Sequence, residues 1–389
     1  MHSNRQEAII VGAVRTPVGK RGGRLAEVHP ADLSAHVLNA LVERTGVDPA
    51  EIDDVVWGCV SQVGEQTFDI ARTAVLSAGW PESVPGTTVD RQCGSSQQAV
   101  HFAAAGLIAG HYDLVVAGGV ESMSRVPMGV AASVLDGQTP IGPRYAERYG
   151  PGFPSQGLGA EMIAERWGLS RQQVDEFALT SHARAADAID GRRFVGEITP
   201  VTLADGTVVD TDEGVRRGGT LDGLAQLKTA FRDDGVLTAG NSSQISDGAA
   251  ALLLCTRDRA EQLGLPPIAR VHAAAIAGSD PVMMLTGPIP ATQKALARAG
   301  LSAADVGVFE VNEAFASVPL AWLAEIGADR ARLNPNGGAI ALGHPLGGSG
   351  ARLMTTMIHH MRANGIRYGL QTMCEGGGQA NATILELAS

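Results

Sequence analysis

Two cysteines and one histidine stand beside glycine-rich segments, and these residue types together suit acyl-group chemistry. Cys93 lies in segment 89–99, between an expected strand and the start of an expected helix. Unpaired amide groups and the positive end of the helix dipole at such a position lower the pKa of a thiol. Cys93 is therefore a candidate nucleophile, and the alternative is a small buried cysteine in a tight turn.

The glycine-rich segment 334–350 contains one histidine, His344. Pro345 fixes the backbone after it, and the glycines permit close approach of a ligand. A lone histidine is more often structural than catalytic, so this loop supports catalysis only together with other residues. The chain has neither a G-x-G-x-x-G after its first strand nor a G-x-x-x-x-G-K-[ST] motif, which argues against a dinucleotide or P-loop site.

Cys374 and Asn312 each stand at the end of an expected strand. Three glycines, beginning with Gly376, follow close behind Cys374, and their N–H groups could hold an oxyanion. Asn312 opens the segment Asn312–Ala316 and contributes a carboxamide. A thiolate that attacks an acyl carbon, a histidine that moves protons and donors for an oxyanion form a coherent acyl-transfer set.

Short apolar runs alternate with helical patterns along the chain, which indicates an α/β architecture. The expected strands are Ala8–Val11, Asp54–Cys59, Thr87–Asp90, Leu114–Gly119, Val308–Val311, Tyr368–Met373 and Ala382–Leu387. The expected helices are Asp32–Thr45, Asp69–Ala78, Ser95–Gly110, Ala291–Ala299, Ala314–Glu325 and Gly347–Ala363.

The second part of this alternation resembles the first, as if one unit had been duplicated. Two pairs of segments carry the similarity: Gly46–Gly58 with Gly300–Asn312, and His111–Gly119 with Arg367–Gly376. Chance similarity between common α/β pieces is the alternative. If the duplication holds, Cys93 and His344 occupy corresponding places, and a pseudo-twofold axis brings both to the centre of the molecule.

Between the two halves, residues 120–238 have a different character. Five prolines and seven glycines fall between residues 121 and 160, which favours a meandering loop region. A helical hairpin is still expected within this region, because Ser170 and Gln173 form a capping box that opens a helix over Arg171–Asp190. An insertion of this length is usually functional, for example as a cover over a ligand.

The composition indicates two or three packed units rather than a small binding module. The chain has 389 residues, 44% of them hydrophobic and 18% charged, which is enough to bury a large core. Its net charge of −11 has the wrong sign for a surface that neutralises nucleic-acid phosphates. Its longest apolar stretches fall far short of the roughly 18 residues that a membrane helix needs. We therefore expect neither a nucleic-acid nor a membrane partner.

The four cysteines are widely separated and form no C-x-x-C pair and no histidine cluster at ligand spacing. A structural zinc and a disulfide framework are both disfavoured, and no metal is expected. The N-terminus has no apolar signal region, and the C-terminus is not a peroxisomal address. A cytoplasmic enzyme is the resulting expectation.

Six ordered segments together resemble the thiolase family, which includes acetyl-CoA acetyltransferases and 3-ketoacyl-CoA thiolases, over essentially the full chain. They are Arg15–Lys20, the Cys93 segment, Asn241–Ala249, Asn312–Ala316, Gly343–Gly347 and Cys374–Gly378. The resemblance implies a five-layered α-β-α-β-α thiolase fold of two similar halves with an inserted loop domain. It divides the chain into residues 1–119 (N-terminal half), 120–240 (loop domain covering coenzyme A), 241–268 (end of the N-terminal half) and 269–389 (C-terminal half).

The same resemblance assigns roles to the site residues. Cys93 takes the acyl group, and His344 activates it. Cys374 protonates the departing acetyl-CoA enolate in thiolysis or deprotonates acetyl-CoA in condensation. Asn312 holds a water that, with His344 Nε2, stabilises the thioester oxygen, while the backbone N–H groups of Cys93 and Gly376 form the oxyanion hole for the tetrahedral intermediate.

Coenzyme A is the implied co-substrate, and no tightly bound cofactor is expected. Six residues match positions that contact coenzyme A in relatives: Arg216, Phe231, Ala239, Ser243, Ala314 and Phe315. Arg216 and Arg217 would supply positive charge for phosphate, unless they form a solvated loop. The family also implies acyl-CoA substrates and a homodimer or homotetramer.

The expected activity is degradative cleavage of a 3-ketoacyl-CoA by coenzyme A through an acyl-cysteine. The amino-acid sequences of the Cys93 and Cys374 segments resemble those of degradative bacterial members, including thiolases of steroid breakdown. Ser155 and Gln156 stand where short-chain biosynthetic members usually carry His-Met, which argues against an enzyme for acetoacetyl-CoA alone. The alternatives are a biosynthetic acetyl-CoA acetyltransferase and a non-catalytic carrier, although a carrier would be expected to lose Cys93, His344 or Cys374. A ketoacyl synthase is disfavoured by the second cysteine.

Overall fold

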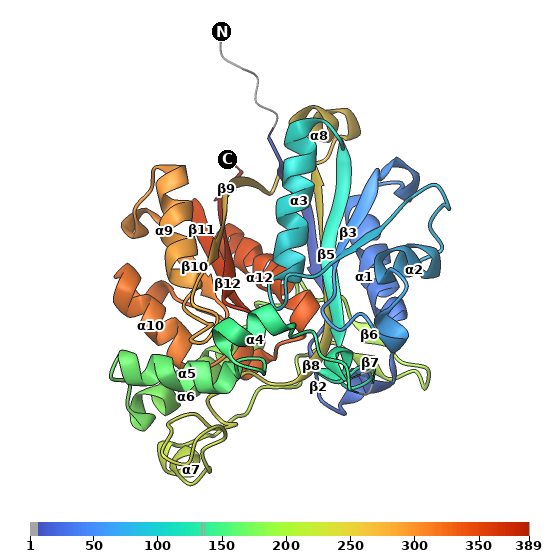
Figure 1. Cartoon of the computed structure of the whole chain (residues 1–389). Coiled ribbons are helices and arrows are strands. Elements are labelled where there is room, and N and C mark those ends of the chain that lie inside the picture. The colour runs from blue at the N-terminus through green and yellow to red at the C-terminus, as the bar shows by residue number, and fades with distance from the viewer. Residues whose placement is uncertain (1–6, 134, 136, 389) are drawn as a thin grey trace.

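The computed structural model describes residues 7–133, 135 and 137–388. Two similar α/β halves pack face to face in Figure 1. The inserted segment, which is the part of residues 120–240 that the structure describes, lies below them in this view. Strands of the first half are β1 (Ile9–Arg15), β3 (Asp54–Gly58), β4 (Thr87–Val89), β5 (Leu114–Ser122) and β8 (Ser246–Cys255). Strands of the second half are β9 (Ala269–Gly278), β10 (Val308–Val311), β11 (Tyr368–Glu375) and β12 (Gln379–Leu387).

The two halves repeat one strand order. It runs β3-β5-β8-β1 in the first half, with β4 added at the edge, and β10-β11-β12-β9 in the second. In each half the first two strands of this order are parallel, and the remaining neighbours are antiparallel. The two parts form one continuous sheet, because β1 and β9 pair through Ile9 with Arg270 and Ile10 with Ala269.

The helices make three layers around the two parts of this sheet. The main helices are α1 (Pro30–Thr45), α2 (Ile70–Ser77), α3 (Ser95–Ala109), α9 (Pro288–Ala299), α10 (Ser317–Ile326) and α12 (Ser349–Asn364). On the outer face of the first half lie α1 and α2, and on the outer face of the second half lies α9, with α10 against it. Between the two parts of the sheet, α3 and α12 pack against each other (Figure 1). The order of layers is therefore α-β-α-β-α.

The duplicated segments adopt the same local structure. Gly46 and Gly300 both end a helix in the left-handed conformation, with φ values of 73° and 66°. Each is followed by a short 3-10 turn and then by a strand, β3 in one half and β10 in the other. The similarity predicted from the sequence is confirmed by this shared geometry.

The inserted segment contains more helix than its prolines and glycines suggest. Its elements are β6 (Val201–Thr202), β7 (Val208–Val209), α4 (Pro143–Tyr149), α5 (Gln156–Arg166), α6 (Arg171–Asp190) and α7 (Leu221–Ala225). The expected capping box begins α6, with Ser170 accepting from the backbone of Gln173 and the Gln173 side chain accepting in return. The expected hairpin had bounds for α6 alone, and the second helix is α5, which begins where the Ser155 side chain accepts from the N–H of Leu158.

The remaining elements are β2 (Gly19–Lys20), α8 (Arg257–Leu263) and α11 (Ala339–Leu342). Within residues 7–133, 135 and 137–388, no helix combines the length and the apolar character that a membrane crossing requires.

Candidate active site

Cys93 lies in the turn between β4 and α3. The residue before it, Gln92, has a positive φ of 46°, which is uncommon for a residue other than glycine. The carboxylate of Asp90 holds this turn by accepting from the Gln92 N–H at 2.6 Å. The Cys93 side chain is 5% exposed and packs with a small apolar cluster that includes Met123 and Leu346. The turn therefore aims the sulfur into the interior, at the start of one central helix.

The expectation of a lowered Cys93 pKa is wrong for this structure. Burial raises the pKa of the thiol to about 12, a value to which the charge of Glu375 in its ionised form contributes less. The position at the start of α3 was identified correctly, but desolvation outweighs the helix dipole there. The Cys93 thiol is therefore neutral near neutral pH.

His344 lies in the corresponding turn before α12, the second central helix. Its Nδ1 is 2.6 Å from the hydroxyl oxygen of Ser349, and that hydroxyl donates to the carbonyl of Pro345 at 2.8 Å. A hydroxyl that donates to Pro345 fits the tautomer in which Nδ1 carries the proton and Ser349 accepts it. Burial, and then the charge of Arg352, lowers the pKa of His344 to about 3. The ring is neutral, and Nε2 is free to accept a proton.

Asn312 follows β10 and faces the free nitrogen of His344. The Asn312 side-chain nitrogen is 3.4 Å from His344 Nε2. Its carbonyl oxygen Oδ1 is buried and has no hydrogen-bond partner among the described residues. A buried acceptor of this kind is ordinarily satisfied by an ordered water. The geometry fits the water that the family resemblance places on Asn312.

The segment Asn241–Ala249 forms hydrogen bonds with the turn of His344 and with the segment that follows Asn312. The His344 N–H donates to the carbonyl of Gln244 and to the hydroxyl of Ser246, each at 3.1 Å. On its other side, the Ser243 N–H donates to the carbonyl of Ala314 at 2.9 Å. Three of the sequence signatures are thus joined by backbone hydrogen bonds in one place.

Cys374 and Gly376 stand at the end of β11. Cys374 is 1% exposed, and burial raises the pKa of its thiol well above the usual range, with a further contribution from Cys93. A Cβ placed on Gly376 would lie 2.9 Å from Oε1 of Gln92, the residue before Cys93. The structure therefore brings the ends of β4 and β11 together, and Cys374 and Gly376 lie beside the Cys93 turn.

A pocket of about 840 Å³ leads from the surface to His344. All six residues expected to contact coenzyme A line it: Arg216, Phe231, Ala239, Ser243, Ala314 and Phe315. Met123 and Leu346, which pack against Cys93, also line this pocket. Ser155 and Gln156 form part of its wall. The pocket therefore connects the inserted segment with His344 and with the apolar residues that pack against Cys93, while Cys93, Asn312, Cys374 and Gly376 are not among its lining residues.

Two aromatic rings form one apolar side of the pocket. Phe231 and Phe315 meet edge to face, with ring centroids 5.5 Å apart. A Cβ on Gly157 would overlap the Phe231 ring, so glycine is needed there for this contact. Phe315 was expected at the start of a helix from Ala314, but α10 begins only at Ser317. An isolated β-bridge between Ser242 and Phe315 and the hydrogen bond from Ser243 to Ala314 hold these residues outside the helix and beside the pocket.

The positive charge at the pocket comes from Arg216 together with Lys20 and Arg21. Arg217 was expected to contribute as well, and this prediction is wrong. Both of its terminal nitrogens donate to the carboxylate of Asp190 at 2.8 Å, on the exposed surface. Lys20 and Arg21 were missed because they are far from Arg216 in sequence and only the fold brings them to the same opening.

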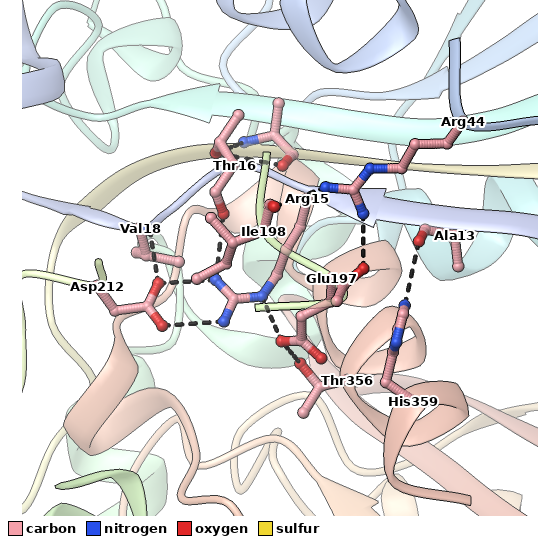
Figure 2. A network of polar contacts seen from close by, with 12 residues as sticks. Ala13, Arg15, Thr16, Val18, Arg44, Glu197, Ile198, Asp212, Thr356 and His359 are labelled. Carbon is pink, nitrogen blue, oxygen red and sulfur yellow. Dashed lines mark hydrogen bonds and ion pairs between the residues drawn. The ribbon is translucent and has the colours of Figure 1, made fainter. Parts of the chain in front are cut away.

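The segment Arg15–Lys20 contributes a buried anchor for the inserted segment (Figure 2). Arg15 donates to Glu197 at 2.6 Å and, through two nitrogens, to Asp212 at 2.7 and 2.9 Å. Its guanidinium carbon also lies 4.9 Å from the centroid of the Phe194 ring. All of these partners belong to the inserted segment, so Arg15 fixes that segment to the end of β1.

Two further residues organise the site without having been expected to do so. Ser349 orients His344, as described above. Glu121, at the end of β5, accepts from the N–H groups of Val60, Ser61 and Gly347 and from the Gln66 amide. Its buried carboxylate thereby ties the loop after β3 to the turn that follows His344. Nothing in the local sequence distinguishes Glu121 from other glutamates.

All four cysteines are free and buried. The described residues contain no group of three or more His, Cys, Asp or Glu side chains that could hold a metal ion.

The chain belongs to the thiolase family. Two sequence models of the family match the chain. The thiolase N-terminal domain matches residues 8–258, and the thiolase C-terminal domain matches residues 265–387. The fold and the signature residues described above agree with this membership.

The chain is similar to several named relatives over nearly its whole length. A steroid 3-ketoacyl-CoA thiolase from Mycobacterium tuberculosis is 51% identical over 385 residues, which cover 98% of this chain and 94% of the relative. A 3-ketoacyl-CoA thiolase from Pectobacterium carotovorum is 46% identical over 98% of this chain and 99% of its own. The crystal structure of the Bacillus anthracis acetyl-CoA acetyltransferase superposes with a TM-score of 0.91 at 38% identity, over 99% of both chains.

Proposed function

We propose that this protein is a degradative thiolase, which cleaves a 3-ketoacyl-CoA with coenzyme A into acetyl-CoA and a shortened acyl-CoA. The pocket of about 840 Å³ carries the proposal, because its lining joins the six expected coenzyme A residues to His344. Relatives named 3-ketoacyl-CoA thiolase, at 46–51% identity, support the degradative direction.

In the first half-reaction, Cys93 Sγ attacks the 3-keto carbon while His344 Nε2 accepts the thiol proton. The bond between the α carbon and the 3-keto carbon breaks, which leaves the acyl group on Cys93. The acetyl-CoA enolate that departs takes a proton from Cys374. In the second half-reaction, Cys374 accepts the proton of the incoming coenzyme A thiol, whose sulfur attacks the acyl carbon. His344 then returns its proton to Cys93.

Two sets of donors would stabilise the charges that develop. A water on Asn312, together with the protonated His344 Nε2, holds the thioester oxygen as the enolate forms. The N–H groups of Cys93 and Gly376 hold the oxyanion of the tetrahedral intermediate. The unpartnered Oδ1 of Asn312 supports the first assignment, and the contact between Gly376 and Gln92 supports the second.

Residues 120–240 would act as a loop domain that covers coenzyme A, between residues 1–119 and 241–268 of the first half and residues 269–389 of the second. Arg216, Lys20 and Arg21 provide positive charge for its phosphates, and Phe231 with Phe315 provides an apolar surface. Coenzyme A is a co-substrate in this proposal, and no metal or tightly bound cofactor takes part.

The second candidate is a biosynthetic acetyl-CoA acetyltransferase that makes acetoacetyl-CoA with the same residues in reverse. The acetyl-CoA acetyltransferase of known structure at 38% identity favours it. Ser155 and Gln156 in the pocket wall favour a longer or bulkier acyl group. Both directions share one transition state, so substrate range is the property that separates the two candidates.

The test is coenzyme A-dependent loss of acetoacetyl, medium-chain, long-chain and polycyclic 3-ketoacyl-CoA thioesters. We expect cleavage of the longer or polycyclic members; activity on acetoacetyl-CoA alone would favour the acetyltransferase, and none at all would favour a carrier. Cys93→Ala should form no acyl-enzyme detectable by mass spectrometry. Cys374→Ala should still become acylated but should not turn over, and full turnover by this variant would contradict the two-cysteine mechanism.

We also propose a homodimer or homotetramer in the cytoplasm, on the family resemblance. Light scattering after size-exclusion chromatography tests the assembly, and a monomer under working conditions would contradict it.

A further inference from the structure

Glu375 is a buried carboxyl group that the proposed mechanism does not use. It follows Cys374 directly at the end of β11, and its side chain is 0% exposed. Neither carboxyl oxygen has a hydrogen-bond partner among the described residues. A buried carboxylate without partners is costly, whereas a neutral carboxyl group in the same place costs far less. The position therefore favours the protonated form.

The carboxyl group lies against the Cys93 turn. A Cβ placed on Gly94, the residue after Cys93, would clash with Glu375 Oε1 and would lie 2.7 Å from the side-chain nitrogen of Asn381. Asn381 pairs with Met373 across the two strands, so Glu375, two residues further along β11, lies on the same face as Asn381. Asn381 donates to the carbonyl of Gly94 at 2.9 Å and thereby fixes the turn beside the carboxyl group.

Four ionisable groups face Glu375. Arg91 and Asp90 approach it from the turn before Cys93, and Cys93 and Cys374 are the two thiols whose pKa values it raises. Arg91 is partly engaged elsewhere, because it donates to the side chain of Gln379 at 2.9 Å. Glu375 is thus the buried carboxyl group that the two reactive thiols share.

We propose that Glu375 is a positioning residue that holds a proton in the resting enzyme, and that its ionisation suppresses thiolate formation at Cys93 and Cys374. The proposal rests on the proposed function, in which these two thiols do the chemistry. When Glu375 is neutral, the carboxylates that still oppose a thiolate at Cys93 are those of Glu121 and Asp90. When Glu375 ionises, its negative charge disfavours a second negative charge on either thiol, so the pKa values of Cys93 and Cys374 rise.

The pH at which this change occurs follows from the surroundings of the carboxyl group. Burial raises the pKa of Glu375 to about 8, against the favourable charge of Arg91. Below about pH 8 the group is neutral and has little effect on Cys93. Above that pH, Cys93 can lose its proton in two ways. Either Glu375 stays ionised and its negative charge repels the new thiolate, or Glu375 takes up a proton as the thiolate forms. The rate of thiolate reactions should therefore stop rising with pH in this range.

The experiment compares the wild type with Glu375→Gln, which has nearly the same shape but cannot ionise. Alkylation of Cys93 by iodoacetamide is measured from about pH 6 to about pH 10, by mass spectrometry of the Cys93 peptide. The two proteins should react at the same rate near pH 7. Above about pH 8 the wild-type rate should flatten while the Glu375→Gln rate continues to rise, reaching about tenfold higher, which corresponds to about one pKa unit.

Two variants separate this effect from a structural one. Glu375→Asp keeps an ionisable group and should keep the flattening. Asp90→Asn removes a more exposed charge near the same turn and should shift the whole profile slightly without removing the flattening. Parallel profiles for wild type and Glu375→Gln at every pH would overturn the proposal, as would a uniform loss of rate in Glu375→Gln.

Failure of this proposal can be distinguished from failure of the proposed function. Coenzyme A-dependent cleavage that survives Cys93→Ala would remove Cys93 from the reaction, whatever the alkylation profiles show. Parallel alkylation profiles in an enzyme that does require Cys93 would remove only the role of Glu375.

Discussion

At the residue scale, the site holds a neutral thiol at Cys93, where a thiol with a lowered pKa was expected. The pKa of the Cys93 thiol is about 12 and that of His344 about 3, so neither group is charged near neutral pH. Transfer of the thiol proton to His344 must therefore accompany attack on the substrate rather than precede it. The reactive state depends on the orientation of the imidazole, because only a neutral Nε2 can accept that proton.

Ser349→Ala tests this orientation. Without the hydroxyl, Nδ1 loses its partner at 2.6 Å and the imidazole can protonate at Nε2 instead. Loss of a buried hydrogen bond of about 1–3 kcal/mol corresponds to a kcat roughly 5- to 150-fold lower, with little change in the KM for coenzyme A. Steady-state kinetics at saturating substrate gives the measurement.

Ser317→Ala is the matched control, since Ser317 also donates to a backbone carbonyl, that of Ala160 at 2.9 Å, but does not contact His344. Its kcat should stay near that of the wild type. Ser349→Thr keeps the hydroxyl and should recover part of the activity. An unchanged kcat in Ser349→Ala would show that Ser349 does not orient the histidine.

At the element scale, the loops rather than the helices and strands decide the geometry of the site. The segment 241–249 holds the turn of His344 on one side and the strand end of Ala314 on the other. The inserted segment, in turn, is fixed to β1 by Arg15 (Figure 2). The pocket forms where these loops meet, so its shape depends on both attachments.

Arg15→Met should destabilise the protein strongly. It removes the fully buried guanidinium and leaves the carboxylates of Glu197 and Asp212 without their cation. Loss of one partner from a buried ion pair costs about 3–5 kcal/mol. Urea denaturation followed by circular dichroism measures the change in the free energy of unfolding.

Arg44→Met provides a comparison in the same region. Exposed Arg44 donates to the backbone carbonyls of Gly196 and Ile198, each at 2.6 Å, and its removal leaves no carboxylate unpaired. We expect a loss on the order of 1 kcal/mol. If Arg15→Met cost no more than Arg44→Met, the buried network would not be the anchor of the inserted segment.

At the scale of the whole molecule, the two halves share one central layer. Helix α3 of the first half crosses α12 of the second, and the turn before each carries one reactive group, Cys93 or His344. Gly350 makes the close crossing possible, because a Cβ there would overlap the backbone nitrogen of Gln97 in α3. The close approach of α3 and α12 at Gly350 therefore contributes to how near the two halves lie to each other.

Gly350→Ala should destabilise the protein although alanine is the better helix former. Overpacking against backbone costs about 1–3 kcal/mol, and the gain in helix propensity is about 1 kcal/mol at most. We expect a net loss of up to about 2 kcal/mol, measured by urea denaturation.

Gly106→Ala in α3 is the control for this prediction, because its new Cβ would meet the side chain of Tyr112, which can move. It should cost less than Gly350→Ala. A Gly350→Ala variant as stable as the wild type would mean that the crossing of α3 and α12 is not tightly packed.

The sequence by itself determined the alternation of strands and helices, the duplication, the capped helix α6 and membership of the thiolase family. These features are local: a cap, a period or a glycine at a strand end acts over a few neighbouring residues, and the chain carries that information directly. Strands β8 and β9 were not among the expected elements, and α10 begins later than expected because another segment pairs with Ala314 and Phe315.

Only the tertiary structure decided the electrostatics. The Cys93 thiol is neutral because distant segments exclude water from it, and the same packing places the carboxyl group of Glu375 beside it. Tertiary packing also decides where the positive charges act. Arg217 is paired with Asp190, whereas Lys20 lines the pocket together with Arg216. Burial and charge depend on what packs against a residue from elsewhere in the chain, so the spacing of residues in the sequence does not contain them.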